Sequence, residues 1–166
     1  MRVTISRTNN PDVVNPLYNH PRVFEILRCD GAPYPLDFSA SITNPENFIF
    51  LASIDGEPGG VVEFDAEGAG DYDIHIAFLP KHWGKGIAPR ACHMAIARMF
   101  DEGARRITAE IANHRAARPA FLIAKRIGFS VEGIRRGVFM RDGKVVDEYR
   151  MVLTPEAFER GAAWAR

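Results

Sequence analysis

Residues 82–88 read His-Trp-Gly-Lys-Gly-Ile-Ala, and they join a strand-like run, Tyr72 to Leu79, to a helix-like run, Gly86 to Glu102. A strand that turns through glycines into a helix is suited to holding phosphate, because the first helical amides have no internal partner. The helix dipole adds about half a positive charge there, and glycines leave the backbone open to a ligand. The segment therefore predicts a pyrophosphate cradle on the amides of residues 84–88.

Two common nucleotide motifs do not fit this turn. A P-loop needs Lys and then Ser or Thr after the second glycine, where this chain has Ile87. A dinucleotide fingerprint needs a third glycine, where the chain has Pro89. Glu110 on the next predicted strand could mimic a ribose-binding carboxylate, but a Rossmann unit puts its cradle after the first strand. The structural alternative is a plain strand-to-helix turn that uses glycine for its dihedral angles.

Composition narrows the function classes. The 166 residues are 46% apolar with a net charge of zero, which indicates one globular domain over residues 1–166 and no general attraction to nucleic acid or membrane. The chain start has no apolar signal stretch, and its two cysteines, Cys29 and Cys92, suggest no disulfide framework, so a cytoplasmic setting is expected. The five histidines show no metal-ligand spacing, and we expect no metal. Cys92 lies on an apolar helical stripe, where core packing is the expectation.

Hydrophobic periodicity and turn signals predict a mixed α/β sheet of six or seven strands flanked by helices. The sharpest turn signals are Asp55-Gly56 and Asp142-Gly143, each between two strand patterns. The predicted strands are 3–6, 48–54, 60–65, 72–79, 106–112, 129–140 and 144–153. The predicted helices are 11–18, 21–28, 86–102, one with Pro119 in its first turn, and a short one opening at Thr154-Pro155-Glu156, while 29–45 reads as a loop with room for one helical turn.

Three segments between about Asn47 and Leu153 resemble the GNAT superfamily of acetyl-coenzyme A dependent N-acetyltransferases. The cradle, with Phe78-Leu79-Pro80 before it, is similar to the family signature Arg/Gln-x-x-Gly-x-Gly/Ala, with Trp83 in place of Arg or Gln. Trp-Gly-Lys-Gly is common in the branch that acetylates ribosomal-protein N-termini. Two further segments resemble that branch: Lys125-Arg126-Ile127-Gly128-Phe129 followed by Val131-Glu132-Gly133 and Arg135, and the hairpin Gly143-Lys144-Val145-Val146-Asp147.

The resemblance implies a GNAT-like fold, acetyl-CoA as cosubstrate and a set of cofactor-binding residues. That set is Phe78, Leu79, Trp83, Gly84, Lys85, Gly86, Ile87, Ala88 and Asn113. Asn113 lies a few residues further upstream of Gly128 than the family's asparagine, and Ala117 holds the aligned position. The chain also has Ala124 where many members carry a tyrosine that protonates the leaving thiolate; Tyr149 or Tyr72 are possible replacements.

Candidates for the catalytic base come from the strand before the cradle. Asp73 and His75 share one face of it, and ionisable groups on a covered strand need partners or a wet cavity. The alternative is a satisfied core histidine and a strand-end aspartate in solvent. Glu110 is the third candidate, since some GNAT enzymes place the base on that strand, although it could equally be a paired surface carboxylate. Glu63 is a still weaker candidate for the base.

We therefore predict an N-acetyltransferase that uses a primary amine, either a peptide N-terminus or a small molecule. The acceptor is expected to enter beside residues 18–45 and the last hairpin, with no nucleic acid or membrane partner, in a monomer or homodimer. The alternative is an acyl-CoA sensor that keeps the cradle without turnover, for which Ala124 is the best support.

Overall fold

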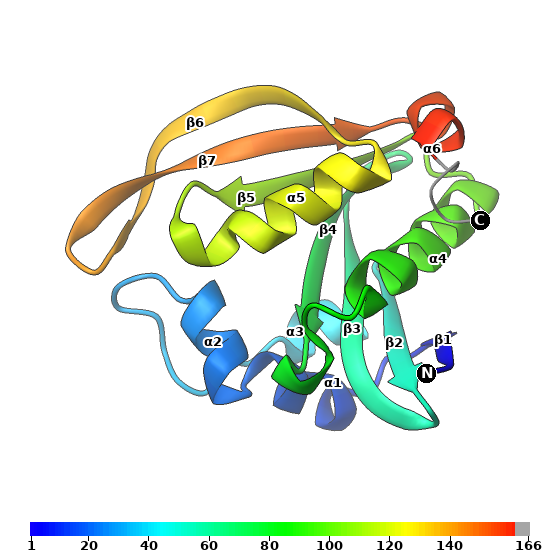
Figure 1. Ribbon diagram of the computed structural model, residues 1–166, viewed down its shortest axis with the longest axis horizontal. Coiled ribbons are helices and arrows are strands. Elements are labelled where there is room, and N and C mark those ends of the chain that lie inside the picture. The colour runs from blue at the N-terminus through cyan, green and yellow to red at the C-terminus, as the bar shows by residue number, and fades with distance from the viewer. Residues whose placement is uncertain (162–166) are drawn as a thin grey trace.

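In the computed structural model, which describes residues 1–161, one mixed sheet carries helices on both faces (Figure 1). Its strands are β1 (Val3–Arg7), β2 (Phe48–Ile54), β3 (Glu57–Gly68), β4 (Asp71–Phe78), β5 (Arg106–Ala112), β6 (Ser130–Arg141) and β7 (Lys144–Leu153). The helices are α1 (Pro11–Tyr18), α2 (Pro21–Leu27), α3 (Ser39–Thr43), α4 (Ile87–Asp101), α5 (Arg118–Ile127) and α6 (Pro155–Gly161), with 3₁₀ turns η1 (Pro80–His82) and η2 (Arg115–Ala117). The strand order is β1-β2-β3-β4-β5-β7-β6, so the predicted fold class is confirmed with seven strands.

The largest departure from the predicted elements is β3, which runs over Glu57–Gly68 rather than 60–65. The prediction stopped at glycines and a proline, which weaken isolated strands. In the sheet, β3 lies between β2 and β4, and irregularities at Ala52/Ser53 and Ala66/Gly68 let pairing continue past those residues. The loop over residues 29–45 contains α3, the helical turn for which the sequence left room.

Two separate cores lie on the two faces of the sheet. On one face, Phe64 and Phe78 pack with residues of α4 and α5. On the other, Val61 and Ala77 pack with residues of α1, α2 and α3. The predicted apolar stripe of α4 is confirmed, and Cys92 within it is buried, which raises the pKa of its thiol to about 12. Cys92 is therefore a core residue and no nucleophile.

The two parallel strands in the middle of the sheet separate part-way along. β4 and β5 pair only at Asp71↔Arg106, Tyr72↔Ile107 and Asp73↔Thr108. Beyond that point β4 stays with β3 as far as Phe78, while β5 stays with β7 as far as Ala112. Figure 1 shows the two strands running in clearly different directions. We call this divergence the fork; it leaves the end of β4 without a partner on its β5 side.

Gly60 allows β3 to lie against Phe78 at the end of β4. A Cβ built on Gly60 would lie 2.2 Å from Cδ1 of Phe78, whose side chain is buried in the core. We expect Gly60→Ala to lower the free energy of unfolding by about 1–3 kcal/mol, as overpacking does. Gly133→Ala is the control, because nothing lies within 4 Å of a Cβ there. Calorimetric unfolding of both variants checks this. Equal stability of Gly60→Ala and Gly133→Ala would show that the core accommodates a methyl group beside Phe78.

Candidate functional site

The predicted cradle forms an open turn at the start of α4. Gly84 and Gly86 have φ of 70° and 72°, the left-handed region that favours glycine, and a Cβ on either would meet nothing within 4 Å. Within residues 1–161, the amides of residues 84–88 have no backbone acceptor. Pro89 falls in the first turn of α4, where its missing N–H costs nothing. The turn therefore offers free donors at the N-terminus of a helix of 15 residues.

Trp83 fixes this turn to the strand before it. Its indole Nε1 donates a 2.7 Å hydrogen bond to the carbonyl oxygen of Phe78. The guanidinium of Arg22 on α2 lies 4.9 Å from the centre of the Trp83 ring. The tryptophan that replaces the family's Arg or Gln thus holds the cradle against the end of β4, and its contact with a cofactor stays a prediction.

The other predicted cofactor residues lie at the wide end of the fork. Leu79 follows β4 and donates its amide to the carbonyl of Gly59, and Lys85 is exposed in the cradle. Asn113 is exposed just beyond β5, where its amide bonds the carbonyl of Asp147. Because parallel strands end at the same side of a sheet, the cradle and Asn113 flank the same opening. Ile87 is buried and Ala88 is half-buried beneath the turn, where they pack against the core.

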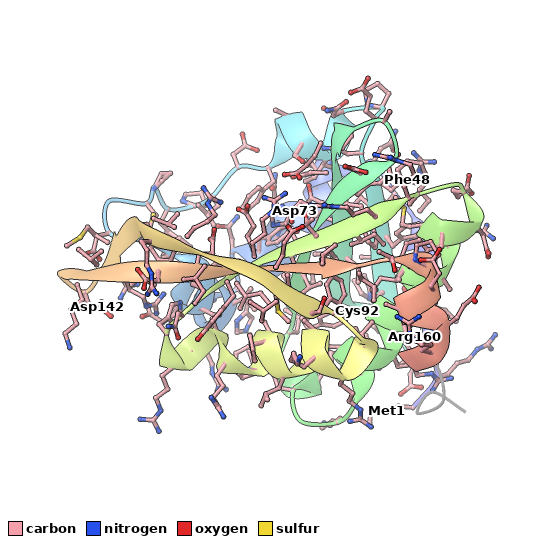
Figure 2. The ribbon with its side chains drawn as sticks, turned by 90° about the horizontal axis from the view of Figure 1, so that it is seen from above. Met1, Phe48, Asp73, Cys92, Asp142 and Arg160 are labelled. Atoms are coloured by element: carbon pink, nitrogen blue, oxygen red, sulfur yellow. The ribbon has the colours of Figure 1, made fainter. Side chains whose placement is uncertain are left out.

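Asp73 and His75 come together at the narrow end of the fork. His75 Nε2 lies 3.2 Å from Asp73 Oδ2 and 3.4 Å from Asp65 Oδ2. Asp73 Oδ1 accepts a 2.8 Å hydrogen bond from the Thr108 hydroxyl. The His75 side chain is 47% exposed, whereas that of Asp73 is only 8% exposed. Figure 2 shows Asp73 near the middle of the molecule, so the alternative of a strand-end aspartate in solvent is excluded.

Behind this pair lies a buried hydrogen-bond network that the sequence did not reveal. The Tyr18 hydroxyl donates to Glu63 Oε2 at 2.6 Å, and the Ser41 hydroxyl contacts Glu63 Oε1 at 2.6 Å and Asp65 Oδ1 at 2.8 Å. Glu63 was the weakest candidate, and here it is 2% exposed. Only the strand register, which puts Glu63 opposite His75 and Asp65 opposite Asp73, could have signalled the cluster.

Burial and charge shift the protonation of this cluster. Burial raises the pKa of Asp73 to about 6, against the opposing effect of His75 and Thr108. Burial would lower the pKa of His75, but the hydrogen bond that it donates to Asp65 and the charges of Asp73, Asp65 and Glu63 raise it to about 9. Burial also raises the pKa of Glu63. Near neutral pH the face therefore holds a largely ionised Asp73 beside an imidazolium.

Glu110 lies on the same face but is held by arginines. Its carboxylate is 2.8 Å from Arg150 and 2.6 Å from Arg135. Arg135 also bonds Glu148 at 2.9 Å. This pairing favours the paired-carboxylate alternative for Glu110, so we keep it as the reserve candidate for a base.

An open strand fork with a helix-start cradle at its wide end defines the acyl-CoA N-acyltransferase fold. The model of the acetyltransferase (GNAT) family matches residues 14–129, and the chain belongs to this family of acetyl-CoA dependent acetyltransferases. No curated protein sequence gives a significant match.

Solved structures with this fold include several N-acetyltransferases. The spermidine N-acetyltransferase from Vibrio cholerae, solved with CoA and spermine, superposes with a TM-score of 0.78 at 19% identity, over 95% of this chain and 98% of that one. The ribosomal-protein-S18-alanine N-acetyltransferase from Escherichia coli gives 0.74 at 17% identity, over 92% and 94%. An N-acetyltransferase from Staphylococcus aureus Mu50 gives 0.75 at 16%, over 93% and 99%. At these identities the likeness concerns the fold.

Two features are absent from the part of the chain that the structure describes. No helix among residues 1–161 is long and apolar enough to cross a membrane. In the same range, no group of three or more His, Cys, Asp or Glu side chains is arranged to hold a metal ion.

The charge of His75 predicts a pH-dependent stability. The folded pKa of about 9 lies above the unfolded value of about 6.5, so the folded chain binds more protons between these pH values. This contribution is complete below about pH 6.5 and is lost as the pH rises through about 9. We expect the wild type to lose more stability than His75→Gln over this window in urea unfolding. The control is His114→Gln, because burial lowers the pKa of His114; parallel curves for wild type and His75→Gln would contradict the assignment.

Proposed function

We propose that this chain transfers the acetyl group of acetyl-CoA to a primary amine at the fork. The supporting observation is the juxtaposition of three features: free cradle amides, an unpaired edge of β4, and the Asp73–His75 pair at the point where β4 leaves β5. A phosphate-binding end and a proton-accepting end thus lie along one strand.

The chain's own residues fit the coenzyme. Open space over Gly84 and Gly86 leaves room for a pyrophosphate on the amides of residues 84–88. The part of β4 from Ile74 to Ala77 has no β5 partner, so its backbone on that side is free to pair with the amides of a pantetheine arm, while the carbonyl of Phe78 is taken by Trp83. When bound, acetyl-CoA would supply an activated thioester carbonyl. Lys85, exposed in the cradle, would add positive charge beside the phosphates.

The protein must position the amine and remove its proton. At pH 7 a lysine-type ammonium costs about 4.6 kcal/mol to deprotonate, and an N-terminal amine only about 1–1.4 kcal/mol. A base of the Asp73–His75 pair would take this proton first, because only the neutral amine has a lone pair with which to bond the acetyl carbon, and the second proton of the nitrogen then passes to the departing sulfur. The carbon–sulfur bond breaks with its electron pair leaving on sulfur.

The expected acceptor side is bounded by segments that contact each other. Arg141 donates to the carbonyls of Ile26 and Arg28 at the end of α2, at 3.2 and 2.9 Å. Asp30 accepts hydrogen bonds from the amides of Asp142 and Gly143, both at 2.8 Å. Figure 2 shows Asp142 at the tip of the β6–β7 hairpin. These contacts make α2 and the hairpin one border of the proposed acceptor site, which would take a peptide N-terminus or a small amine. A cytoplasmic setting and a monomer or homodimer stay predictions.

The second candidate function is an acyl-CoA sensor without turnover. Ala124 is buried in the core where many family members carry a tyrosine. Of the possible replacements, Tyr149 packs on Phe121 of α5, with ring centres 5.0 Å apart, while Tyr72 packs on Phe48 of β2. A thiol with a pKa of about 8.5 leaves without an acid. The loss of this tyrosine is therefore compatible with catalysis and counts against the transferase less than it would with a poorer leaving group.

Cofactor binding tests the cradle. We expect the wild type to bind acetyl-CoA in the micromolar range, about 7–8 kcal/mol. Gly86→Glu should abolish binding, because the carboxylate would occupy the phosphate position. Gly103→Glu is the matched control, since Gly103 has a φ of 97° and equally open space at the other end of α4. Calorimetry on all three checks this, and equal affinity in wild type and Gly86→Glu would refute the cradle.

An amine panel tests the reaction. We expect release of free thiol from acetyl-CoA with at least one acceptor among N-terminal peptides, polyamines and small amines. Asp73→Asn and His75→Gln should each lower kcat/KM by about 10²- to 10⁴-fold if the pair handles the proton.

The controls separate the pair from its neighbours. Asp71→Asn, on the same strand but paired with Arg105, should leave kcat/KM unchanged. Normal rates for both pair variants with a loss in Glu110→Gln would put the base on β5. Tight acetyl-CoA binding with no acceptor consumed would favour the sensor.

A further inference from the structure

Asp65 and Asp73 form an unfavourable pair that His75 relieves. The two carboxylates are direct partners across the β3–β4 ladder and project from the same face of the sheet. Like charges directly opposite one another destabilise a sheet. His75 lies one pleat further along that face, and its Nε2 approaches both, at 3.4 Å from Asp65 Oδ2 and 3.2 Å from Asp73 Oδ2. A single nitrogen of the imidazole, Nε2, thus contacts both carboxylates.

Each carboxylate is itself held in place by other bonds. Asp65 Oδ1 accepts a hydrogen bond from Asn47 Nδ2 at 2.8 Å and lies 2.8 Å from the Ser41 hydroxyl, whose single proton is shared with Glu63. Asn47 is buried, and its side-chain oxygen Oδ1 accepts a hydrogen bond from the amide of Ala66. Asp73 Oδ1 is held by Thr108 in the same way. In both residues one oxygen is fixed by the scaffold and the other is directed at His75.

Among the side chains of Asp65, Asp73 and His75, the described residues offer no partner to one proton-accepting atom, His75 Nδ1. Asp73 has a bonded partner at each oxygen and is only 8% exposed. His75 is 47% exposed, and across residues 1–161 no hydrogen-bond partner is found for its Nδ1. Two acceptors at Nε2 keep the proton on that nitrogen, so loss of the other proton leaves the lone pair on Nδ1.

We propose that Asp65 is a positioning residue: together with Asp73 it grips the Nε2–H of His75, so that His75 Nδ1 takes the proton of the acceptor amine. The proposal rests on the proposed acetyl transfer. The amine's proton moves to Nδ1, the amine nitrogen bonds the acetyl carbon, and the sulfur leaves with the bonding pair. Solvent then takes the proton from the imidazolium.

The charges that face His75 set the pH at which this base works. β3 contributes Glu63 directly opposite and Asp65 diagonally, β4 contributes Asp73, and Glu110 of β5 adds negative charge near Asp73. Tyr18 of α1 and Ser41 of α3 bond Glu63, and Arg150 neutralises part of Glu110. The surplus is negative, and the pKa of His75 is raised to about 9. Activity should therefore rise with pH through about 9.

The test is Asp65→Asn, which keeps the size of the side chain and an oxygen for Ser41 and Asn47. Loss of one neighbouring anion should lower the pKa of His75 by about one unit or more, as read by NMR titration of the assigned imidazole. The ascending limb of kcat/KM should move to lower pH by the same amount, measured with one acceptor throughout so that its own titration is common to all proteins. Asp71→Asn is the matched control and should move neither.

Each result decides the proposal. If Asp65→Asn lowers the His75 pKa but the ascending limb of kcat/KM stays at the same pH, His75 is not the base. The same follows if the wild-type limb lies near pH 6. An unmoved His75 pKa would show that Asp65 does not hold the imidazole. Lower stability or kcat without a shift of the limb would mean a purely structural role for Asp65. A wild type that acetylates nothing would overturn the proposed function and the base, while the NMR titration would still report on the grip of Asp65.

Discussion

The site depends on the end of pairing between β4 and β5 after Asp73 and Thr108. Up to that point the strands share a parallel ladder, and beyond it each keeps only its other neighbour. A sheet interior ordinarily satisfies every backbone group within itself. Here the sheet leaves one edge open in its middle, with a helix start at the wide end and a cluster of ionisable groups at the narrow end. The cradle and the Asp73–His75 pair are both placed by this single divergence.

Electrostatics at the narrow end follows from strand register. Antiparallel pairing puts Asp65 opposite Asp73 and Glu63 opposite His75, so three carboxylates surround one imidazole. Burial makes each uncompensated charge costly, and the network meets this cost with Tyr18, Ser41, Asn47 and Thr108 as donors. A protonated histidine among these anions stabilises the fold at neutral pH and loses that role as the pH rises. The protonation of His75 that stabilises this face is also the protonation that the proposed chemistry would change.

One face of the sheet is apolar, and the other is partly polar. The face under α4 and α5 is an apolar core that anchors the cradle through Trp83 and Phe78. The opposite face is apolar only where α1, α2 and α3 cover it, and it turns polar towards β5, β7 and β6. Two hydrogen bonds join the α2 segment to the hairpin beside that polar region: Arg141 donates to the carbonyl of Arg28, and the amide of Asp142 donates to Asp30. The surface proposed to bind the acceptor is thus backed by the larger of the two cores.

The sequence by itself determined the local elements and predicted the cofactor end of the proposed site. Periodicity and turn signals are local, so Asp55-Gly56 and Asp142-Gly143 marked their hairpins, and two glycines before an apolar helical stripe marked the cradle. The alternation of β4 also put Asp73 and His75 on one face. Tertiary structure alone decided that Asp65, Glu63 and Thr108 join them, and that Glu110 is taken by Arg135 and Arg150. The reason is that register between strands and the point where two strands part are set by long-range packing, which no single stretch of sequence encodes.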